Sequence, residues 1–391
     1  MSVHNTIATV SHIPRIAVVI PKYGPVGGAE RFACEVTERL ARSGHYEFHV
    51  FANCWQATPG SPVVFHKIPI IKFPRSLRPW SFPWFAQRAI ECGQFNLVHS
   101  HDRIFRADVF SVHCIPHVSW VLSVRQKRVS IFDRTVAAVE RRMMRSSAAK
   151  WFLPVSSLAM ESFRRTYSEL HGQWRIMHPG VNATQFASPD RKMCRLEIRG
   201  RLGISDKDLL VLFVGMNFEV KGLDTIMAAL AKARTKANVR LLVVGRGNES
   251  KYRQLARFYG IDAAVTFVGP QGTGLEQYYR AADIFIMLSL FDTFGMVVLE
   301  AMAAGLPVIV SPNVGAKDLV VEGKNGFVLP SAQDVDAAAD RILQLRDPVR
   351  WMAMSADAVH TAAQHDWDGL ARQLEIIYQQ VLDDKCKRGG E

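Results

Sequence analysis

The chain has 391 residues, of which 48% are hydrophobic and 21% charged, and its formal net charge is +12 at pH 7. This length and composition predict two or three globular domains with sizeable cores, and they exclude a disordered chain. No apolar run approaches the ~18 residues of a membrane-spanning helix, because the longest runs, such as IFIMLSLF at 284–291, are strand-sized.

The positive charge is unevenly distributed. Residues 1–180 contain 23 Lys and Arg against 11 Asp and Glu, whereas the remaining residues contain 25 of each kind. This asymmetry predicts that the first half meets an anionic partner, which could be nucleic acid, acidic lipid or a phosphorylated substrate. The six cysteines show no CxxC and no zinc-like spacing with histidine, so we interpret them as reduced thiols. The N-terminal segment resembles no signal peptide, which predicts a cytosolic protein.

The first half is predicted to alternate strands and helices. The strand RIAVVI (15–20) is followed by the turn PKYGPVGG and by a helix over 29–42 with apolar residues at helical spacing. Further strands are predicted at 47–52, 95–100, 107–114 and 150–156, with an Arg-rich helix at 131–147. Such alternation favours a parallel sheet covered by helices.

A second series begins after the Pro-Gly joint HPGVN (178–182). Its strands are predicted at 209–215, 239–245, 264–269, 283–289 and 306–310, and its helices at 222–235, 249–259, 274–282 and 294–304. A last helix, over about 367–382, follows this second sheet. Two Rossmann-like halves are therefore expected.

Two features could hold phosphate groups. The turn before residue 29 places the backbone N–H groups of Gly27 and Gly28 at a helix N-terminus, although a tight turn without a ligand explains it equally well. The segment is neither GxGxxG nor a P-loop. Lys221 stands just before another helix, where it is either a phosphate partner or a solvated lysine.

The stretch DTFGMVVLEAMAAGLPVIV (292–310) contains two carboxylates of interest. Glu300 lies in an apolar helix, which costs free energy unless the carboxylate is exposed or has a polar partner, so we expect a partner for it. A carboxylate there can accept hydrogen bonds from the vicinal hydroxyls of a ribose. Asp292 precedes the helix and could simply be its N-cap.

A basic and aromatic stretch occupies residues 67–88, KIPIIKFPRSLRPWSFPWFAQR. Its prolines predict a loop or irregular hairpin. Cations beside tryptophan suit an anionic bilayer surface, with Arg75, Arg78, Trp80 and Trp84 as its contacts. Intramolecular packing is the alternative, and nucleic acid is disfavoured because no binding motif accompanies the stretch. A second cluster, Arg141, Arg142, Arg145 and Lys150, could bind acceptor phosphates or form a solvated helix face.

Several motifs together resemble a known family, from about residue 15 to 382. They are GGxER near the start, VGxxxxxKG, VVGxG, AADIF, and the acid-x7-Glu element followed by AMAAGLPVIVS. This pattern looks like the family 4 retaining glycosyltransferases of the GT-B fold. Within that family PKYGPVGGAERF, ADVFSVHC, WFLPVSSLAMESFRRTY and MHPGV are most similar to the lipopolysaccharide core glucosyltransferase I type.

The resemblance implies a role for individual residues. Glu300 would bind the ribose of a nucleotide-sugar, and Asp292, where most members have Glu, would contact the transferred sugar. The donor would also meet Gly245, Arg246 and the backbone of Phe294, Gly295, Met296 and Val297. Gly27, Gly28 and Lys221 would neutralise the departing diphosphate, and His113, with Asp108 as the alternative, would stand near the reacting carbon. Met216 occurs where members commonly have Arg, so Arg31 or Arg246 would compensate.

We therefore expect an α/β protein of two Rossmann-like domains facing a cleft. Residues 1–180 would form the acceptor and membrane side, residues 181–365 the nucleotide-sugar side, and residues 366–391 would pack back on the first. The expected enzyme is a retaining hexosyltransferase, which moves glucose from UDP-glucose onto a lipid-linked or lipopolysaccharide-core acceptor at the cytosolic membrane face. It would use no cofactor and no metal, because the three Asp-x-Asp sequences are explained by capping.

Other readings remain open from the sequence. A mannosyl- or N-acetylhexosaminyl-transferase of the same family would differ only in its donor. A nucleotide-sugar epimerase on the same fold would need no acceptor, and a binding protein without catalysis would release no product. A monomer that binds no nucleic acid is expected in each case.

Overall fold

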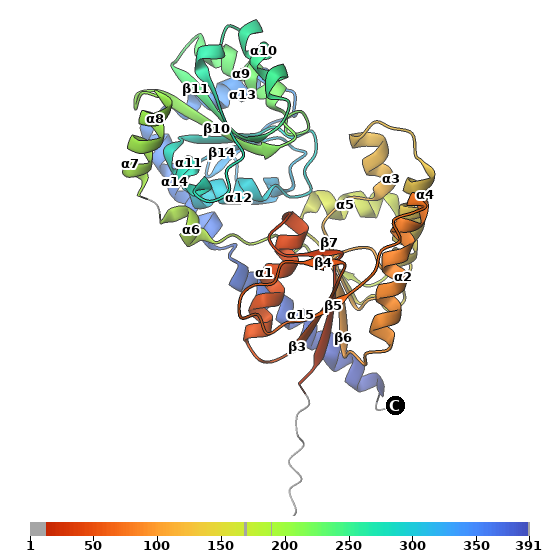
Figure 1. The fold of residues 1–391 in the computed structure, drawn as a ribbon. Helices are drawn as coiled ribbons and strands as arrows, with labels where there is room; N and C mark the ends of the chain where they lie inside the picture. The colour runs from red at the N-terminus through yellow and green to blue at the C-terminus, as the bar shows by residue number, and fades with distance from the viewer. Residues whose placement is uncertain (1–12, 168–169, 189, 390–391) are drawn as a thin grey trace, which may run out of the picture.

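The fold consists of two α/β lobes, each built around a parallel sheet (Figure 1). The computed structural model describes residues 13–167, 170–188 and 190–389. The segment 1–12, on which the expectation about a signal peptide falls, lies outside the described residues. No helix in the described ranges is both long and apolar enough to cross a membrane.

Each sheet has its strands in an order that differs from their order in the chain. In the first sheet the order is β5 (Val64–Lys67), β3 (Glu47–Ala52), β1 (Arg15–Val19), β6 (Leu97–Ser100), β7 (Val109–Val112), β8 (Trp151–Pro154) and β9 (Gln173–Trp174). In the second sheet it is β12 (Val265–Gly269), β11 (Val239–Arg246), β10 (Leu209–Met216), β13 (Ile284–Met287), β14 (Val308–Val310) and β15 (Gly326–Val328). The short strands β2 (Lys22–Tyr23) and β4 (Cys54–Trp55) form a separate pair.

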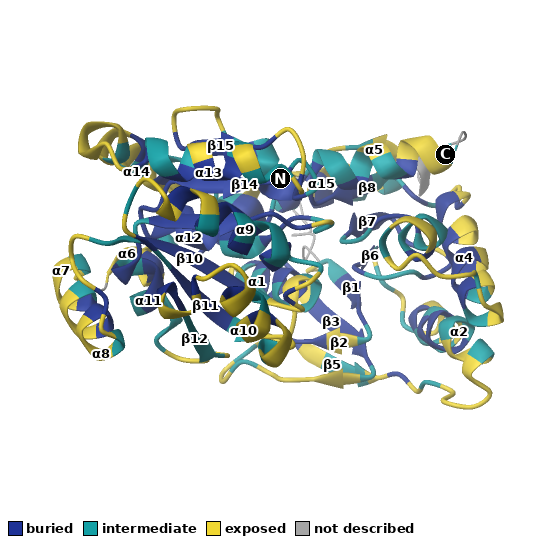
Figure 2. Cartoon of the chain, turned by 90° about the horizontal axis from the view of Figure 1, so that it is seen from above, coloured by how far each residue is buried: buried dark blue, intermediate teal, exposed yellow. Residues whose placement is uncertain are grey.

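Helices cover both sheets, as Figure 2 shows by the buried strands inside each lobe and the exposed outer sides of the helices. Those of the first lobe are α1 (Gly28–Arg42), α2 (Arg78–Glu91), α3 (His117–Ser119), α4 (Ile131–Met144) and α5 (Ser157–Thr166). Those after the joint are α6 (Ala183–Ala187), α7 (Arg191–Cys194), α8 (Gly200–Leu202), α9 (Leu223–Arg234), α10 (Glu249–Phe258), α11 (Leu275–Ala281), α12 (Met296–Ala303), α13 (Val335–Gln344), α14 (Pro348–Ala363) and α15 (Trp367–Gly389).

Short irregular turns complete the chain. They are η1 (Arg75–Leu77), η2 (Trp120–Val124), η3 (Arg195–Arg199), η4 (Asp262–Ala264) and η5 (Gly315–Leu319), of which η2 and η3 are π-helical.

The strand orders create one switch point in each sheet. In the first sheet the chain runs outward from β1 through β3 to β5 and then returns to place β6 on the other side of β1. In the second sheet β10 and β13 are related in the same way. Ligands of open parallel sheets bind at the carboxyl ends of the strands beside such a switch point, so each lobe offers one crevice.

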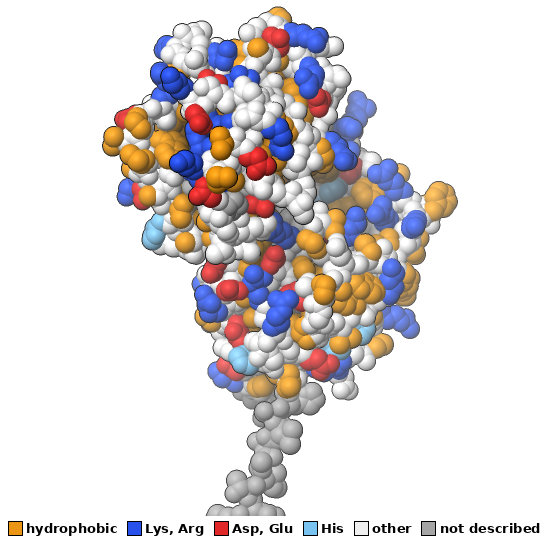
Figure 3. Space-filling view, turned by 60° about the vertical axis from the view of Figure 1, so that its left-hand side comes forward, with side chains coloured by type: hydrophobic (Ala, Val, Ile, Leu, Met, Phe, Trp, Pro, Cys, Tyr) orange, Lys and Arg blue, Asp and Glu red, His pale blue; other side chains and the backbone are white. Residues whose placement is uncertain are grey.

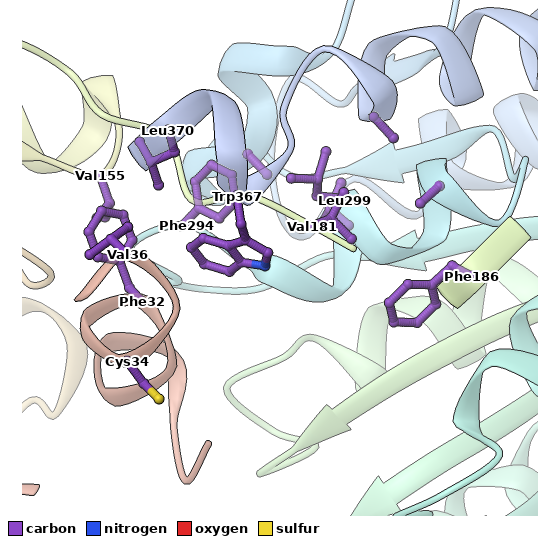
Figure 4. Packing of buried hydrophobic residues seen from close by; sticks show 14 of the residues in the cluster. Phe32, Cys34, Val36, Val155, Val181, Phe186, Phe294, Leu299, Trp367 and Leu370 are labelled. Atoms are coloured by element: carbon purple, nitrogen blue, oxygen red, sulfur yellow. The ribbon is translucent and has the colours of Figure 1, made fainter. Parts of the chain in front are cut away.

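The joint between the lobes is a packed core. Gly180 passes so close to the start of α15 that a Cβ there would lie 2.7 Å from the Trp367 nitrogen, which is why only glycine fits. Val181 N donates to His365 O at 2.9 Å, so the outgoing and returning segments are tied together. Figure 4 shows the Trp367 indole beside Phe32 of α1 and Phe294 of the second lobe. The apolar core thus continues across the joint.

The last helix crosses back onto the first lobe. Along α15, the hydroxyl of Tyr378 lies 2.7 Å from Nδ1 of His99 in β6, and Lys385 Nζ donates to Asp108 at 2.7 Å. The expected α/β fold with two Rossmann-like domains and a returning C-terminal helix is confirmed.

The prediction of a loop or hairpin over 67–88 was wrong for residues 78–88, which are helical. After η1, the chain forms α2, whose buried residues Phe82, Ala86 and Ile90 recur every four positions. Pro79 lies in the first turn, where no backbone donor is needed, so it does not prevent the helix. The prolines outweighed this spacing in the sequence prediction.

Candidate active site

A cavity of about 640 Å³ lies between the two lobes. Its second-lobe wall is formed by the carboxyl ends of β10 and β11 and by the start of α12, and its first-lobe wall by the start of α1 and the end of β7. Of the site residues predicted from sequence, it brings together Gly27, Gly28, His113, Lys221, Gly245, Asp292, Phe294, Gly295, Met296, Val297 and Glu300. The cavity is adjacent to the switch point of the second sheet.

Two helix N-termini face each other across this cavity. Helix α1 begins at Gly28, with Gly27 as its N-cap, and α12 begins at Met296, with Gly295 as its N-cap. A Cβ on Gly28 would lie 3.7 Å from the Met296 sulfur, so the Met296 side chain reaches across to the start of α1. Unpaired backbone N–H groups and helix dipoles from both lobes therefore favour an anion between them.

Lys221 is positioned by a tight turn after β10. Gly222 adopts a left-handed conformation (φ 77°), and a Cβ there would lie 2.0 Å from Leu288 O, so the turn can press against the end of β13. The ammonium of Lys221 consequently pairs with Asp292. Asp292 also accepts from Phe294 N at 3.2 Å and is not the N-cap of α12, which is Gly295.

Glu300 has the partners that its apolar helix predicted. Arg31 Nη1 donates to one carboxylate oxygen at 3.0 Å, and the Tyr279 hydroxyl donates to the other at 3.1 Å. Burial raises the pKa of Glu300, while the Arg31 charge and these two hydrogen bonds oppose the rise. Arg31 belongs to α1, so this ion pair joins the two lobes across the cavity.

Two of the residues predicted to contact the donor or the reacting carbon lie outside the cavity. Asp108 precedes β7 whereas His113 follows it, so they lie at opposite ends of that strand, and Asp108 accepts from Val98 N and Lys385. Its role as an alternative to His113 was wrong, because a carboxylate that anchors α15 does not face the cleft. Arg246 ends β11 as an exposed side chain and does not line the cavity either, whereas Arg31 does.

A smaller cavity of about 300 Å³ adjoins the first and shares His113 and Ala29 with it. It lies at the switch point of the first sheet, between the carboxyl ends of β1 and β6. Its polar lining comprises Lys22, Glu30, His101, Asp102, Arg103, Ser111 and His113. His101 was not predicted as a site residue; its position directly after the predicted strand at 95–100 was the available signal.

The histidines at this cavity are neutral. Burial lowers the pKa of His113 to about 3 and lowers that of His101 well below its usual value. His101 Nδ1 lies 3.2 Å from His113 Nε2, while the buried Nε2 of His101 has no hydrogen-bond partner among the described residues. We assign the proton of His101 to Nδ1, from which it is donated to Nε2 of His113. The unpaired Nε2 of His101 is then an acceptor, which costs less free energy than an unpaired, buried N–H. This tautomer leaves His113 Nδ1 protonated as a donor.

The outer side of the first lobe is strongly basic. Figure 3 shows Lys and Arg together with hydrophobic side chains, and some Asp and Glu, on the side of the lower lobe that it draws. Exposed residues along α2, α4 and the segments before them are Lys72, Phe73, Arg75, Leu77, Arg78, Trp84, Arg88, Arg125, Lys127, Arg128, Ile131, Arg134, Arg141, Arg142 and Arg145. We call this set the basic outer face. Trp80 is only half exposed, because it packs against Phe105, whose ring also lies 4.5 Å from the Arg142 guanidinium.

Within the described parts of the chain, no three His, Cys, Asp or Glu side chains form a group that could hold a metal ion. The expected independence from metals stays a prediction. The six cysteines are free thiols.

Both halves of the chain match models of known protein families. Residues 26–185 match a model described as Glycosyltransferase Family 4, and residues 195–348 match Glycosyl transferases group 1. An uncharacterized glycosyltransferase of Methanocaldococcus jannaschii is 24% identical over 94% of this chain and 99% of its own. The lipopolysaccharide glucosyltransferase WaaG of Escherichia coli K12 is also 24% identical, with the same coverage of both chains.

Solved structures show the same fold. The crystal structure of WaaG superposes with a TM-score of 0.76 at 22% identity, covering 93% of this chain and 99% of that chain. Anabaena Alr3699/HepE in complex with UDP-glucose superposes with a TM-score of 0.71 at 18% identity, covering 94% and 99%.

Proposed function

We propose a donor, an acceptor and a site of action for this chain, which belongs to the family 4 glycosyltransferases and has their GT-B fold. The proposed reaction moves glucose from UDP-glucose onto a lipid-linked or lipopolysaccharide-core acceptor. The observation that carries the proposal is the interlobe cavity, in which two helix N-termini, Lys221 and Glu300 converge. This set of groups matches the diphosphate and ribose of a nucleotide-sugar.

The donor is proposed to lie with its diphosphate between the starts of α1 and α12. There the N–H groups of Gly27, Gly28 and Met296 and the ammonium of Lys221 would meet its charge. The ribose would donate to Glu300, and the sugar would face Asp292 and the backbone of residues 294–297. Likeness to HepE, solved with UDP-glucose, and to the glucosyltransferase WaaG favours glucose as the sugar.

The acceptor is proposed to enter through the adjoining smaller cavity. Its neutral histidines and its mixture of acids and bases suit a polyhydroxylated sugar ring. Because His113 lines both cavities, an acceptor hydroxyl beside it would be next to the donor's reacting carbon. The His113 Nδ1 donor would then orient the transferred sugar or the attacking hydroxyl.

We propose retention of configuration by a front-face substitution. The bond between C1 of the sugar and the diphosphate oxygen breaks, the acceptor oxygen bonds to C1 on the same face, and the acceptor's proton passes to the departing diphosphate. Lys221 and the helix N-termini would stabilise the charge that develops on the diphosphate. A glycosyl-enzyme is not invoked, because the two acids that line the interlobe cavity, Asp292 and Glu300, are engaged with Lys221 and Arg31.

The site of action is proposed to be the cytosolic face of a membrane, reached through the basic outer face. Exposed Phe73, Leu77 and Trp84 can enter the interfacial region, while each nearby cation adds about 1 kcal/mol of attraction to anionic lipid. The exposed Arg141 and Arg142 could also contact acceptor phosphates. Likeness to WaaG, named for its lipopolysaccharide substrate, supports a lipid-borne acceptor.

The test is nucleotide release by the purified protein from UDP-glucose, UDP-N-acetylglucosamine, ADP-glucose and GDP-mannose, each with and without heptose-terminated rough lipopolysaccharide. We expect release from UDP-glucose that increases with acceptor and yields an α-linked product. Acceptor-dependent release from another donor would replace glucose by that sugar. Conversion of a donor without any acceptor would instead favour an epimerase.

A further inference from the structure

Among the described residues, the four charged side chains that line the interlobe cavity form two ion pairs with one another, and Arg31 has a further, longer contact of 3.7 Å with Glu35. Lys221 pairs with Asp292 within the second lobe, and Arg31 of the first lobe pairs with Glu300 of the second. A donor that uses Glu300 for its ribose must therefore displace Arg31. This displacement rests on the proposed function, namely that the cavity binds a nucleoside diphosphate.

A nucleoside diphosphate carries groups complementary to both members of the Arg31 and Glu300 pair. Its ribose hydroxyls donate hydrogen bonds, which suit a carboxylate, and its diphosphate accepts them, which suits a guanidinium. We propose that donor binding exchanges these partners: the ribose takes Glu300, and the released Arg31 turns to the diphosphate. Arg31 is thus a donor-binding residue that occupies the ribose site of the free protein.

The geometry makes Arg31 the member that moves. Glu300 is 9% exposed and is also held by Tyr279, so its carboxylate keeps its place when Arg31 leaves. The Arg31 side chain is 26% exposed and lies in the first turn of α1, directly behind Gly27 and Gly28. A turn of its long side chain therefore reaches the proposed diphosphate position without a shift of the helix.

The exchange also supplies a second cation for the diphosphate, besides Lys221. Met216 ends β10 at the cavity without a charge, and Lys221 already neutralises Asp292. Because Glu300 has less need of a counter-charge once it accepts two hydroxyl hydrogen bonds, Arg31 becomes available at the moment a diphosphate arrives. Ribose recognition and diphosphate recognition are coupled through this one side chain.

The coupling predicts effects of opposite sign for two probes. Removal of the guanidinium in Arg31→Met frees Glu300 from its competitor, so uridine, which has a ribose but no phosphate, should bind about threefold to tenfold more tightly at pH 8. The same variant loses a charge-assisted contact to the diphosphate, so UDP should bind about tenfold more weakly. Arg31→Lys, which retains the charge, should restore part of the UDP affinity.

The experiment is calorimetric titration of the full chain with uridine and UDP, after thermal melts have established that each variant is folded. Arg42→Met is the matched control, because Arg42 lies on the same helix, pairs with Glu38 and does not line the cavity. Equal weakening of both probes in Arg31→Met, or unchanged UDP affinity, would overturn the exchange while leaving the donor site in place. Failure of the wild type to bind UDP, ADP or GDP would overturn the proposed function as well.

Discussion

The two crevices of this molecule adjoin each other, but they differ in the charge state of the side chains where they meet the strand ends. At the second-sheet switch point, the cavity is lined by charged residues that neutralise one another, Lys221 with Asp292 and Glu300 with Arg31. At the first-sheet switch point, the side chains of His101 and His113 are neutral, because burial lowers the pKa of each. The folds of the two halves are alike, so the difference lies in the residues at the strand ends.

This difference indicates what each crevice can recognise. Paired charges exchange partners readily with a ligand that carries both anionic and hydroxyl groups, as a nucleotide-sugar does. Neutral imidazoles hydrogen-bond to hydroxyls without favouring either charge, as a sugar acceptor requires. Charge on the acceptor would then be met by the basic outer face, away from the reacting atoms. Four substitutions test this division.

The largest effect is expected for Lys221→Met. This change removes the ammonium that would stabilise the departing diphosphate, so kcat should fall about 10²-fold to 10³-fold with little change in the acceptor KM. Steady-state kinetics at saturating donor measure it. The control is Lys232→Met, because Lys232 pairs with Asp336 on the surface of the same lobe. A rise in the acceptor KM with no fall in kcat would contradict the assignment of Lys221 to the donor side.

Glu300→Gln is expected to weaken donor binding about 10-fold to 100-fold, because a neutral amide replaces a carboxylate that accepts from the ribose. The wild type should also lose donor affinity as the pH falls through the raised pKa of Glu300, since the protonated form accepts less well. The variant should lack this acidic limb. Titrations with UDP between pH 5 and 8 compare the two, and parallel pH profiles would refute the role.

His101→Asn should act on the other crevice. The change removes the ring that holds His113 Nε2 and occupies the smaller cavity, so the acceptor KM should rise about tenfold while the donor Kd stays the same. Kinetics with varied acceptor and UDP titration separate the two values. His45→Asn, at an exposed histidine that contacts Glu375 of α15, serves as the control. A weaker donor Kd in His101→Asn would mean that the crevices are not separate.

The smallest effect on catalysis is expected at the basic outer face. Replacing Phe73 and Trp84 by Ser should lower binding to anionic liposomes about tenfold, because both side chains are exposed. The turnover of a water-soluble acceptor should be unchanged. Cosedimentation with vesicles measures it. Replacing Trp80 should do less than replacing Trp84, since its ring is partly covered by Phe105. Equal cosedimentation of the parent and the double variant would contradict membrane binding by the basic outer face.

The sequence predicted the second sheet almost strand by strand. In the first sheet it also predicted β1, β3, β6, β7 and β8, but it missed the edge strands β5 and β9. Strands β10 to β14 are apolar segments, and glycines mark the starts or ends of the helices between them. These local sequence patterns are enough to predict the strands. Strand β15 and helices α13 and α14 went unpredicted. A three-residue strand is too short to show alternation, whereas α13 has apolar residues at helical spacing, Ala338, Ala339 and Ile342, which the prediction overlooked. Helix α2 was hidden by its prolines.

Within the site, the sequence predicted residue types better than partners. The cost of an acid in an apolar helix indicated that Glu300 needed a partner, but Arg31 is 269 residues away in the chain and Tyr279 lies on another helix. The pair of His101 and His113 depends on the register of β6 and β7, which sequence periodicity does not fix. Asp108 was misplaced although the predicted strand was right, because ligands of a parallel sheet bind at the carboxyl ends of its strands, where His113 lies, and Asp108 lies at the other end.

The division between the two crevices is tested most directly by measuring donor hydrolysis and sugar transfer separately in the same three proteins: wild type, Glu300→Gln and His101→Asn. Hydrolysis needs only the donor crevice, whereas transfer needs both. We predict that Glu300→Gln lowers both rates at subsaturating donor, while His101→Asn lowers transfer and leaves hydrolysis at the wild-type rate. A loss of hydrolysis in His101→Asn equal to its loss of transfer would contradict the account.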